Sequence, residues 1–298
     1  MNAVTLRNKS AAGELLEATF LPEFGMNMIS FKKDTLEVID QSTRSLFEER
    51  YAGLGALIGP HFHHRKPELI PPIKDESLFP HLAALKAKGI REPFSHGIAR
   101  YAPWNCQATE TRIEAVLTGK DTLKGIPLAE LEGQNFKMTL IAELTPTGLK
   151  LDLAIVSDTD SLVGLHYYYH LPRGKGVVSS QVQAHYLKGL EKKPIPPEWH
   201  FDPQHQLRFS LDQAADYTFY PFPNPLEGKI LLDAGDYKLL TTYTAPSQEN
   251  CWQLYHPEKA SFVCIEPISS QDPRHPNLSV SSIQIQLQII TGDQPNEI

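Results

Sequence analysis

The sequence predicts an all-β protein, built as a large antiparallel β-sandwich with few short helices. Two observations support this fold class: short segments in which apolar and polar residues alternate, and 24 proline and 18 glycine residues scattered between those segments. Alternation with a period of two places one face of a strand in a core, and proline and glycine are typical of the turns that join strands. We therefore expect a chain that consists mainly of strands and turns.

The clearest strand is the last one, residues 283–289, where isoleucine or leucine alternates with glutamine. A helix cannot bury its apolar side chains with a period of two. Residues 149–156 repeat the pattern, and residues 136–144 show it more weakly. Because residues 145–148 read Thr-Pro-Thr-Gly, these two segments are expected to pair as a hairpin.

Helical signals are few. Residues 43–50 and 77–87 are expected to form short helices. Residues 67–80 and 192–206 each contain four prolines and are expected to be extended loops. Long loops on a β scaffold commonly carry binding groups.

The size and composition are consistent with one large β domain over residues 1–298. The chain has 298 residues, of which 41% are hydrophobic and 21% charged, and shows no repeat, low-complexity tract or linker. All-β sandwiches often exceed 200 residues as a single unit. A large buried core is therefore expected, and disorder is not.

The charge balance excludes several kinds of partner. A net charge of −7 argues against nucleic acid, whose binding needs clustered lysine and arginine, and against an anionic membrane. Residues 1–18 lack the features of a secretory signal, and no run approaches 18 apolar residues. We therefore expect a cytoplasmic protein, a monomer or homodimer, whose three cysteines are reduced and hold neither a disulfide framework nor zinc.

Glu266 ends a strongly apolar segment, Phe262-Val263-Cys264-Ile265, and is followed by Pro267. A carboxylate at the end of a buried strand has its charged form disfavoured by desolvation, which raises its pKa and makes it a better general base. The alternative is a glutamate turned to solvent or paired with an arginine.

His166 lies in a run of aromatic residues from Leu165 to Leu171. On a strand, His166, Tyr168 and His170 share one face. An imidazole that titrates near neutrality is suited to giving a proton to a ring oxygen and taking it back. The alternative is an aromatic core strand with hydrogen-bonded histidines.

Other polar residues have weaker signals. His61, His63 and His64 suggest a metal site in which His61 and His63 face the same way on a strand, but they lack a matching cysteine or His-x-x-x-His partner, so no metal is predicted. His96 precedes Gly97, which indicates a close approach of backbone or ligand. Arg65 and Arg100 can each form paired hydrogen bonds to sugar hydroxyls or to a phosphate, or can serve as surface ion-pair partners.

Common nucleotide-binding and hydrolase motifs are absent. The sequence has no G-x-G-x-x-G, no G-x-x-x-x-G-K-[ST] and no G-x-S-x-G. Nucleotide binding and the common serine hydrolase arrangement therefore lack support.

Taken in order, six segments of the chain resemble the aldose 1-epimerase (galactose mutarotase) family. They are residues 24–26 (Phe-Gly-Met), 60–65, 96–100, 166–171, 216–219 and 264–267 (Cys-Ile-Glu-Pro), and they span nearly the whole chain. The resemblance implies a galactose mutarotase-like supersandwich with its site in an open groove.

The resemblance also implies roles for individual residues. His166 is similar to the family's general acid and Glu266 to its general base, and His96, Arg65 and Asp216 are similar to its substrate-binding groups. Arg100 is a further candidate for binding substrate, and Tyr168 or Trp104 for stacking on the sugar. The implied function is interconversion of the α and β anomers of an aldose, an isomerase reaction that needs no cofactor.

The chain departs from the family pattern in places that bear on the substrate. Tyr169-His170 replace an aromatic-Asn pair, the His-Gly segment lacks a further glycine, and Pro172-Arg173 follow the histidine strand. Arg65, Arg100 and Arg173 would suit a phosphorylated sugar. The alternatives are therefore a hexose-6-phosphate 1-epimerase, or a non-catalytic carbohydrate-binding protein of the same fold.

Overall fold

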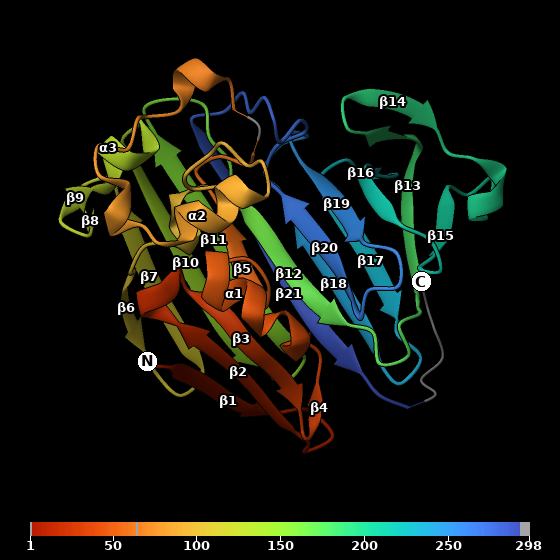
Figure 1. Ribbon diagram of the computed structural model, residues 1–298. Helices are drawn as coiled ribbons and strands as arrows, with labels where there is room; N and C mark the ends of the chain where they lie inside the picture. The colour runs from red at the N-terminus through yellow and green to blue at the C-terminus, as the bar shows by residue number, and fades with distance from the viewer. Residues whose placement is uncertain (1, 64, 293–298) are drawn as a thin grey trace.

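Two antiparallel sheets, joined through one long shared strand, form the framework of the computed structural model, which describes residues 2–63 and 65–292 (Figure 1). In order across the first sheet, the strands are β1 (Val4–Lys9), β2 (Leu15–Leu21), β3 (Asn27–Lys33), β5 (Gly55–Ile58), β12 (Gly164–His170), β20 (Phe262–Ile268), β19 (Cys251–His256), β16 (Ala215–Pro221) and β13 (Val177–Lys188), with β4 (Leu36–Glu37) beside β3 and β14 (Glu191–Pro194) beside β13.

The second sheet packs on the first. Its strands, in order, are β6 (Asn105–Ala108), β7 (Arg112–Thr118), β10 (Phe136–Thr145), β11 (Gly148–Ser157), β21 (Val280–Ile290), β18 (Lys238–Thr244), β17 (Glu227–Asp233), β13 and β15 (Gln206–Ser210). A small separate hairpin consists of β8 (Thr122–Leu123) and β9 (Ile126–Pro127).

Strand β13 belongs to both sheets. Its first half pairs with β15 and β17, and its second half pairs with β14 and β16, with a shift in register between Val182 and Tyr186. A bulge of this kind bends a strand and increases its twist. The bend carries β13 from one layer of the sandwich to the other.

The helices are short, as expected. The α-helices are α1 (Arg44–Arg50), α2 (His81–Ala87) and α3 (Leu128–Glu132), and the 3-10 turns are η1 (Pro22–Phe24), η2 (Gln41–Thr43), η3 (Pro67–Leu69), η4 (Glu76–Leu78), η5 (Ile98–Arg100) and η6 (Pro197–Trp199). Helices α1 and α2 lie in front of the first sheet in Figure 1. In the described part of the chain, no helix has the length and apolar character needed to cross a membrane.

The predicted all-β sandwich is confirmed, and so are its clearest elements. In β21 the four apolar residues from Ile283 to Ile289 are at most 5% exposed. Strands β10 and β11 pair along their full length as the predicted hairpin, which closes at Thr145 and Gly148.

Two local predictions need correction, and one short helix was missed. The helix expected over residues 77–87 is shorter: η4 and α2 are separate turns, because proline has no N–H to continue a helix across Pro80. Residues 192–206 are not one loop, since they contain most of β14 and the turn η6. Helix α3 was not predicted.

The core lies between the sheets, and β12 is buried on both of its faces. Tyr167 and Tyr169 are fully buried within the main apolar core, whereas His166 and Tyr168 point to the opposite face. That opposite face is covered by helices and loops, and the cover leaves a cavity over the sheet.

Candidate active site

A cavity of about 650 Å³ lies over the central strands of the first sheet. Its floor comes from β12, β16, β19 and β20, and its walls come from the segments at residues 50–52, 62–70, 85–92 and 95–101. All seven residues that the sequence analysis proposed for catalysis or substrate binding line this cavity: Arg65, His96, Arg100, His166, Tyr168, Asp216 and Glu266.

Strand register brings the floor residues together. His166 and Tyr168 stand on β12, and β20 pairs with it antiparallel so that Tyr168 lies opposite Cys264. The next strand, β19, places Gln253 opposite Glu266. Because residues with a period of two share a face, these side chains form rows across the sheet.

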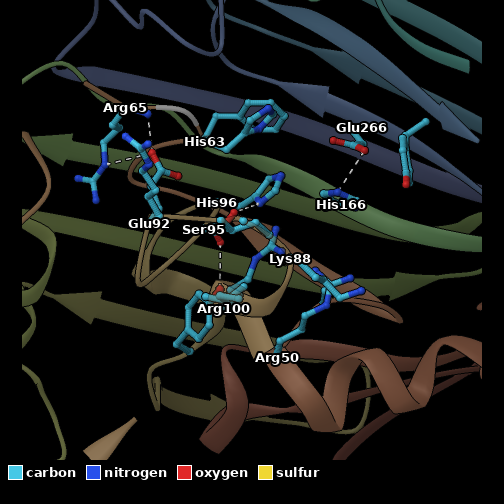
Figure 2. A pocket seen from close by; sticks show the side chains of 18 of the residues that line it. Arg50, His63, Arg65, Lys88, Glu92, Ser95, His96, Arg100, His166 and Glu266 are labelled. Atoms are coloured by element: carbon cyan, nitrogen blue, oxygen red, sulfur yellow. Dashed lines mark hydrogen bonds and ion pairs between the residues drawn. The ribbon is translucent and has the colours of Figure 1, made fainter. Parts of the chain in front are cut away.

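His166 and Glu266 form the centre of the floor. Atom Nε2 of His166 lies 3.4 Å from Oε1 of Glu266. The side chains are only 9% and 2% exposed, and Nδ1 of His166 and Oε2 of Glu266 are buried without a hydrogen-bond partner. Figure 2 shows the two groups directed at each other. Both residues line the cavity, so a ligand there would contact this pair.

Burial favours the uncharged form of both groups. It raises the pKa of Glu266 well above its ordinary value, and the nearby Arg100 only partly opposes the shift. Burial also lowers the pKa of His166, and the positive charge of Arg100 lowers it further. Both shifts favour the state in which the imidazole is neutral and the carboxyl group carries the proton that the pair shares.

Glu266 thus differs from both simpler alternatives. It is not turned to solvent, and within residues 2–63 and 65–292 it forms no ion pair with an arginine. The upward shift of its pKa by desolvation agrees with the interpretation of the sequence.

Aromatic rings surround the imidazole of His166. Tyr168 stacks on it with ring centroids 5.0 Å apart, and His96 contacts it edge-on, also at 5.0 Å. His63 in turn lies 5.0 Å from His96. Burial and the charge of Arg100 lower the pKa of His96, which favours its neutral form, and His63, His96 and His166 line this side of the cavity.

The predicted close approach at Gly97 is confirmed. A Cβ atom at Gly97 would lie 1.9 Å from the carbonyl oxygen of Gly59, and Gly97 has a φ of +89°. Backbone hydrogen bonds from Gly59 to His96 and from Ala99 to Gly59 join the same two segments. Only glycine allows these segments to pack so closely and to direct His96 into the cavity.

Arg65 is held mainly by acidic neighbours. Its Nη1 donates to the backbone carbonyl of Glu132 at 2.9 Å, and its Nε lies 3.9 Å from a carboxylate oxygen of Glu92. Glu132, from α3, also accepts a hydrogen bond from the backbone of Ile98 and contacts Nδ1 of His61. One buried carboxylate therefore ties together the two loops that carry His63 and His96.

Arg100 and Arg50 differ from Arg65, because neither has an ion-pair partner in the part of the chain that the structure describes. Arg100 is 2% exposed; its Nε donates to the carbonyl of Leu57, while Nη2 has no partner. Nε of Arg50, the last residue of α1, is also buried without a partner. Figure 2 draws both on one side of the cavity, together with Lys88.

Two expectations about other residues were wrong. Arg173 lies at the surface, where it pairs with Asp236, and does not line the cavity. Trp104 does not line it either: its Nε1 donates to the carbonyl of Ala99 within the core.

The metal hypothesis for the histidine cluster also changes. His61 and His63 follow β5 in irregular backbone rather than on a strand, and His64 lies outside the described residues. A different set, His166, Cys264 and Glu266, has donor atoms that all lie within 4.8 Å of one another. His166 and Glu266 line the cavity, whereas Cys264 is fully buried beside them.

Several lining residues were missed by the sequence analysis, among them Arg50, Gln253 and Tyr255. Gln253 and Tyr255 carry no motif, and only the pairing of β19 with β20 and β16 places them beside Glu266 and Asp216. Asp216 itself is exposed and stands near the mouth of the cavity.

Solved structures of similar fold cover nearly the whole chain. The Slr1438 protein from Synechocystis has a TM-score of 0.68 at 15% sequence identity, over 98% of this chain and 97% of that one. A galactose mutarotase-like protein from Lactobacillus casei has a TM-score of 0.66 at 12% identity, over 97% and 100%. An aldose epimerase homologue from C. elegans has a TM-score of 0.65 at 13% identity, over 97% and 100%.

Comparisons by sequence gave a different outcome. No protein-family model matches the chain, and no curated protein matches it significantly. At identities of 12–15% the structural likeness concerns the fold alone. The resemblance seen in the sequence motifs is thus confirmed at that level, and the chain has the galactose mutarotase-like fold.

Proposed function

We propose that this protein is an isomerase that interconverts the α and β anomers of an aldose by acid–base opening and reclosure of the sugar ring. The observation that carries the proposal is the His166–Glu266 pair, 3.4 Å apart at the floor of a cavity of about 650 Å³. Ring opening needs one group that takes the proton of the C1 hydroxyl and another that protonates the ring oxygen.

The proton transfers balance within the pair. In the sense that the resemblance implies, Glu266 accepts the proton from the C1 hydroxyl while His166 donates one to the ring oxygen. The C1–O5 bond breaks, and C1 becomes the carbonyl carbon of an open-chain aldehyde. Rotation about C1–C2 and reversal of both transfers give the other anomer, so no redox change or covalent enzyme intermediate is involved.

This direction of proton transfer requires that His166 carries the shared proton before the reaction begins. Burial by itself favours its place on Glu266. Sugar hydroxyls that donate to the Glu266 carboxylate would replace part of its lost hydration, which favours the ionised carboxylate and moves the proton to His166. The opposite direction of proton transfer, in which Glu266 is the acid and His166 the base, also conserves the protons.

The other polar residues of the cavity are proposed to orient the sugar. His96 and Asp216 line the cavity on different segments and are suited to hydrogen bonds with ring hydroxyls. Arg65 can add a donor from Nη2, which is buried without a partner. Tyr168 is proposed to pack against the sugar beside His166.

A phosphorylated aldose is the second candidate substrate. The observation that favours it is the pair of guanidinium groups of Arg50 and Arg100, which line the cavity without a carboxylate partner among residues 2–63 and 65–292. Lys88 and Arg91 line the same cavity, in a protein of net charge −7. An anionic group would relieve the mutual repulsion of these cations and satisfy their free N–H donors.

Exchange between anomers, followed by NMR, tests the proposal directly. Purified protein should speed the exchange for a free or a 6-phosphorylated aldose, and Glu266→Gln should abolish the effect. Glu227→Gln, an exposed glutamate on β17, is the matched control and should keep full activity. Exchange no faster than in buffer across a panel of both kinds of sugar would refute the proposal, and saturable binding without acceleration would favour the non-catalytic alternative.

A further inference from the structure

Cys264 lies beside the proposed catalytic pair, covered beneath the cavity floor. It stands two residues before Glu266 on β20, so both side chains share one face of the strand, and it pairs across the sheet with Tyr168. Cys264 is fully buried and is not among the residues that line the cavity. A thiol, an imidazole and a carboxyl group are therefore gathered at one point.

The spacing of the three donor atoms is close to that of a zinc site. The donors lie within 4.8 Å of one another, and the imidazole Nε2 and carboxylate Oε1 are 3.4 Å apart. Bond lengths of about 2.0–2.3 Å in a tetrahedral zinc site put neighbouring N and O ligands about 3.4 Å apart, and a sulfur about 3.6 Å from either. To reach these spacings, the donors need to approach one another by at most about 1 Å.

Orphaned polar atoms and charge also favour a cation here. Glu266 is 2% exposed, and its Oε2 has no partner in the described chain. Cysteine and glutamate bind a metal ion as anions, so the two side chains together balance the charge of a divalent cation.

We propose that His166, Cys264 and Glu266 form a binding site for one thiophilic divalent cation of the Zn²⁺ type. The ligand set of one nitrogen, one sulfur and one oxygen selects such an ion over Mg²⁺ or Ca²⁺. The fourth position of a tetrahedral site would face the cavity, and Figure 2 shows that His166 and Glu266 border this space. A bound cation would coordinate the basic atoms of His166 and Glu266, which could then no longer act as acid and base. This loss of catalysis rests on the proposed function, whereas the binding of the cation does not.

Titration of the full-length protein with Cd²⁺ alone tests the site. One equivalent should bind and give the ultraviolet thiolate-to-cadmium charge-transfer band. In Cys264→Ser this band should vanish and the affinity should fall by about 100-fold or more. Cys251→Ser, which alters the neighbouring fully buried cysteine on β19, is the matched control and should titrate like the wild-type protein.

The outcomes separate the two proposals. A wild-type protein without the band, a band that survives in Cys264→Ser, or one lost in Cys251→Ser would overturn the cation site, whatever the activity. Cys264→Ala provides a second variant if serine disturbs the floor, with circular dichroism as the check on folding. If anomer exchange is observed, Zn²⁺ should inhibit the wild-type protein and spare Cys264→Ser.

Discussion

His166 on β12 and Glu266 on β20 face each other across two paired strands, with 3.4 Å between Nε2 and Oε1. Their positions are fixed by the hydrogen-bonded register of a central sheet rather than by a loop. Groups on rigid elements hold their geometry more accurately than groups on loops, and proton transfer depends on that accuracy.

Removal of either member of the pair should abolish most of the activity. Because each proton transfer typically contributes 10²–10⁴-fold, His166→Asn and Glu266→Gln are each expected to lower the rate of anomer exchange by about that factor. His275→Asn, at an exposed histidine paired with Asp272, is the matched control for the imidazole. Variants that keep more than a tenth of the wild-type rate would contradict the assigned roles.

Arg50 should discriminate between phosphorylated and free sugars. A hydrogen bond to a charged group contributes about 1.5–3 kcal/mol, so Arg50→Gln is expected to raise KM for a 6-phosphorylated aldose by roughly 10–100-fold. The KM for the corresponding free aldose should change little. Arg173→Gln, at an arginine paired with Asp236 on the surface, should affect neither substrate. Equal effects of Arg50→Gln on both sugars would argue against a phosphate subsite.

His96 should make the folded protein sensitive to mild acid. Burial lowers the pKa of His96 below its ordinary value of 6.5. As pH falls through 6.5 the unfolded chain therefore binds a proton that the folded protein does not, and the free energy of unfolding decreases. His96→Gln should make this decrease shallower by up to about 1.4 kcal/mol per pH unit.

Urea unfolding between pH 7.5 and about 5.5 measures this slope. His275→Gln provides the exposed control, which should follow the wild-type curve. A His96→Gln variant whose stability falls as steeply as that of the wild-type protein would contradict the assignment.

Gly97 and Gly13 allow a matched test of the close approach near His96. Both have a φ of +89°, but a Cβ at Gly13 would meet nothing within 4 Å, whereas at Gly97 it would lie 1.9 Å from the Gly59 carbonyl oxygen. Gly13→Ala should cost about 1–2 kcal/mol for its backbone conformation alone. Gly97→Ala should cost roughly 1–3 kcal/mol more, because the two segments must separate. Thermal unfolding of the two variants checks the difference.

The sequence was most informative where periodicity and burial coincide. The period of two in residues 283–289 predicted β21, and the apolar run before Glu266 predicted a buried strand. The expected end of that strand at Glu266 was wrong, because β20 continues through Pro267 to Ile268 and stays paired with β19. The period of two expected for the strand that carries His166 correctly placed His166 and Tyr168 on one face. These patterns are local, and each reflects the face of a strand that the core covers.

Features that depend on contacts between distant segments were not predictable. Gln253 reaches the cavity only because β19 pairs with β20, and Arg50 only because α1 lies over the first sheet. The pairing of Arg65 with Glu92 and Glu132 depends on two loops and on a five-residue helix that lacks a strong sequence signal. The single domain, the cytoplasmic location and the monomer or homodimer stay predictions.

The strands that make the cavity floor come from distant parts of the chain, with β12 near the middle and β19 and β20 close to the end. Contacts between such distant segments form slowly, because the loops between them must close first. A nascent chain would therefore have no working floor until its final third had left the ribosome. Ligand binding should reappear late on refolding, together with the completed central strands rather than with the early β10–β11 hairpin.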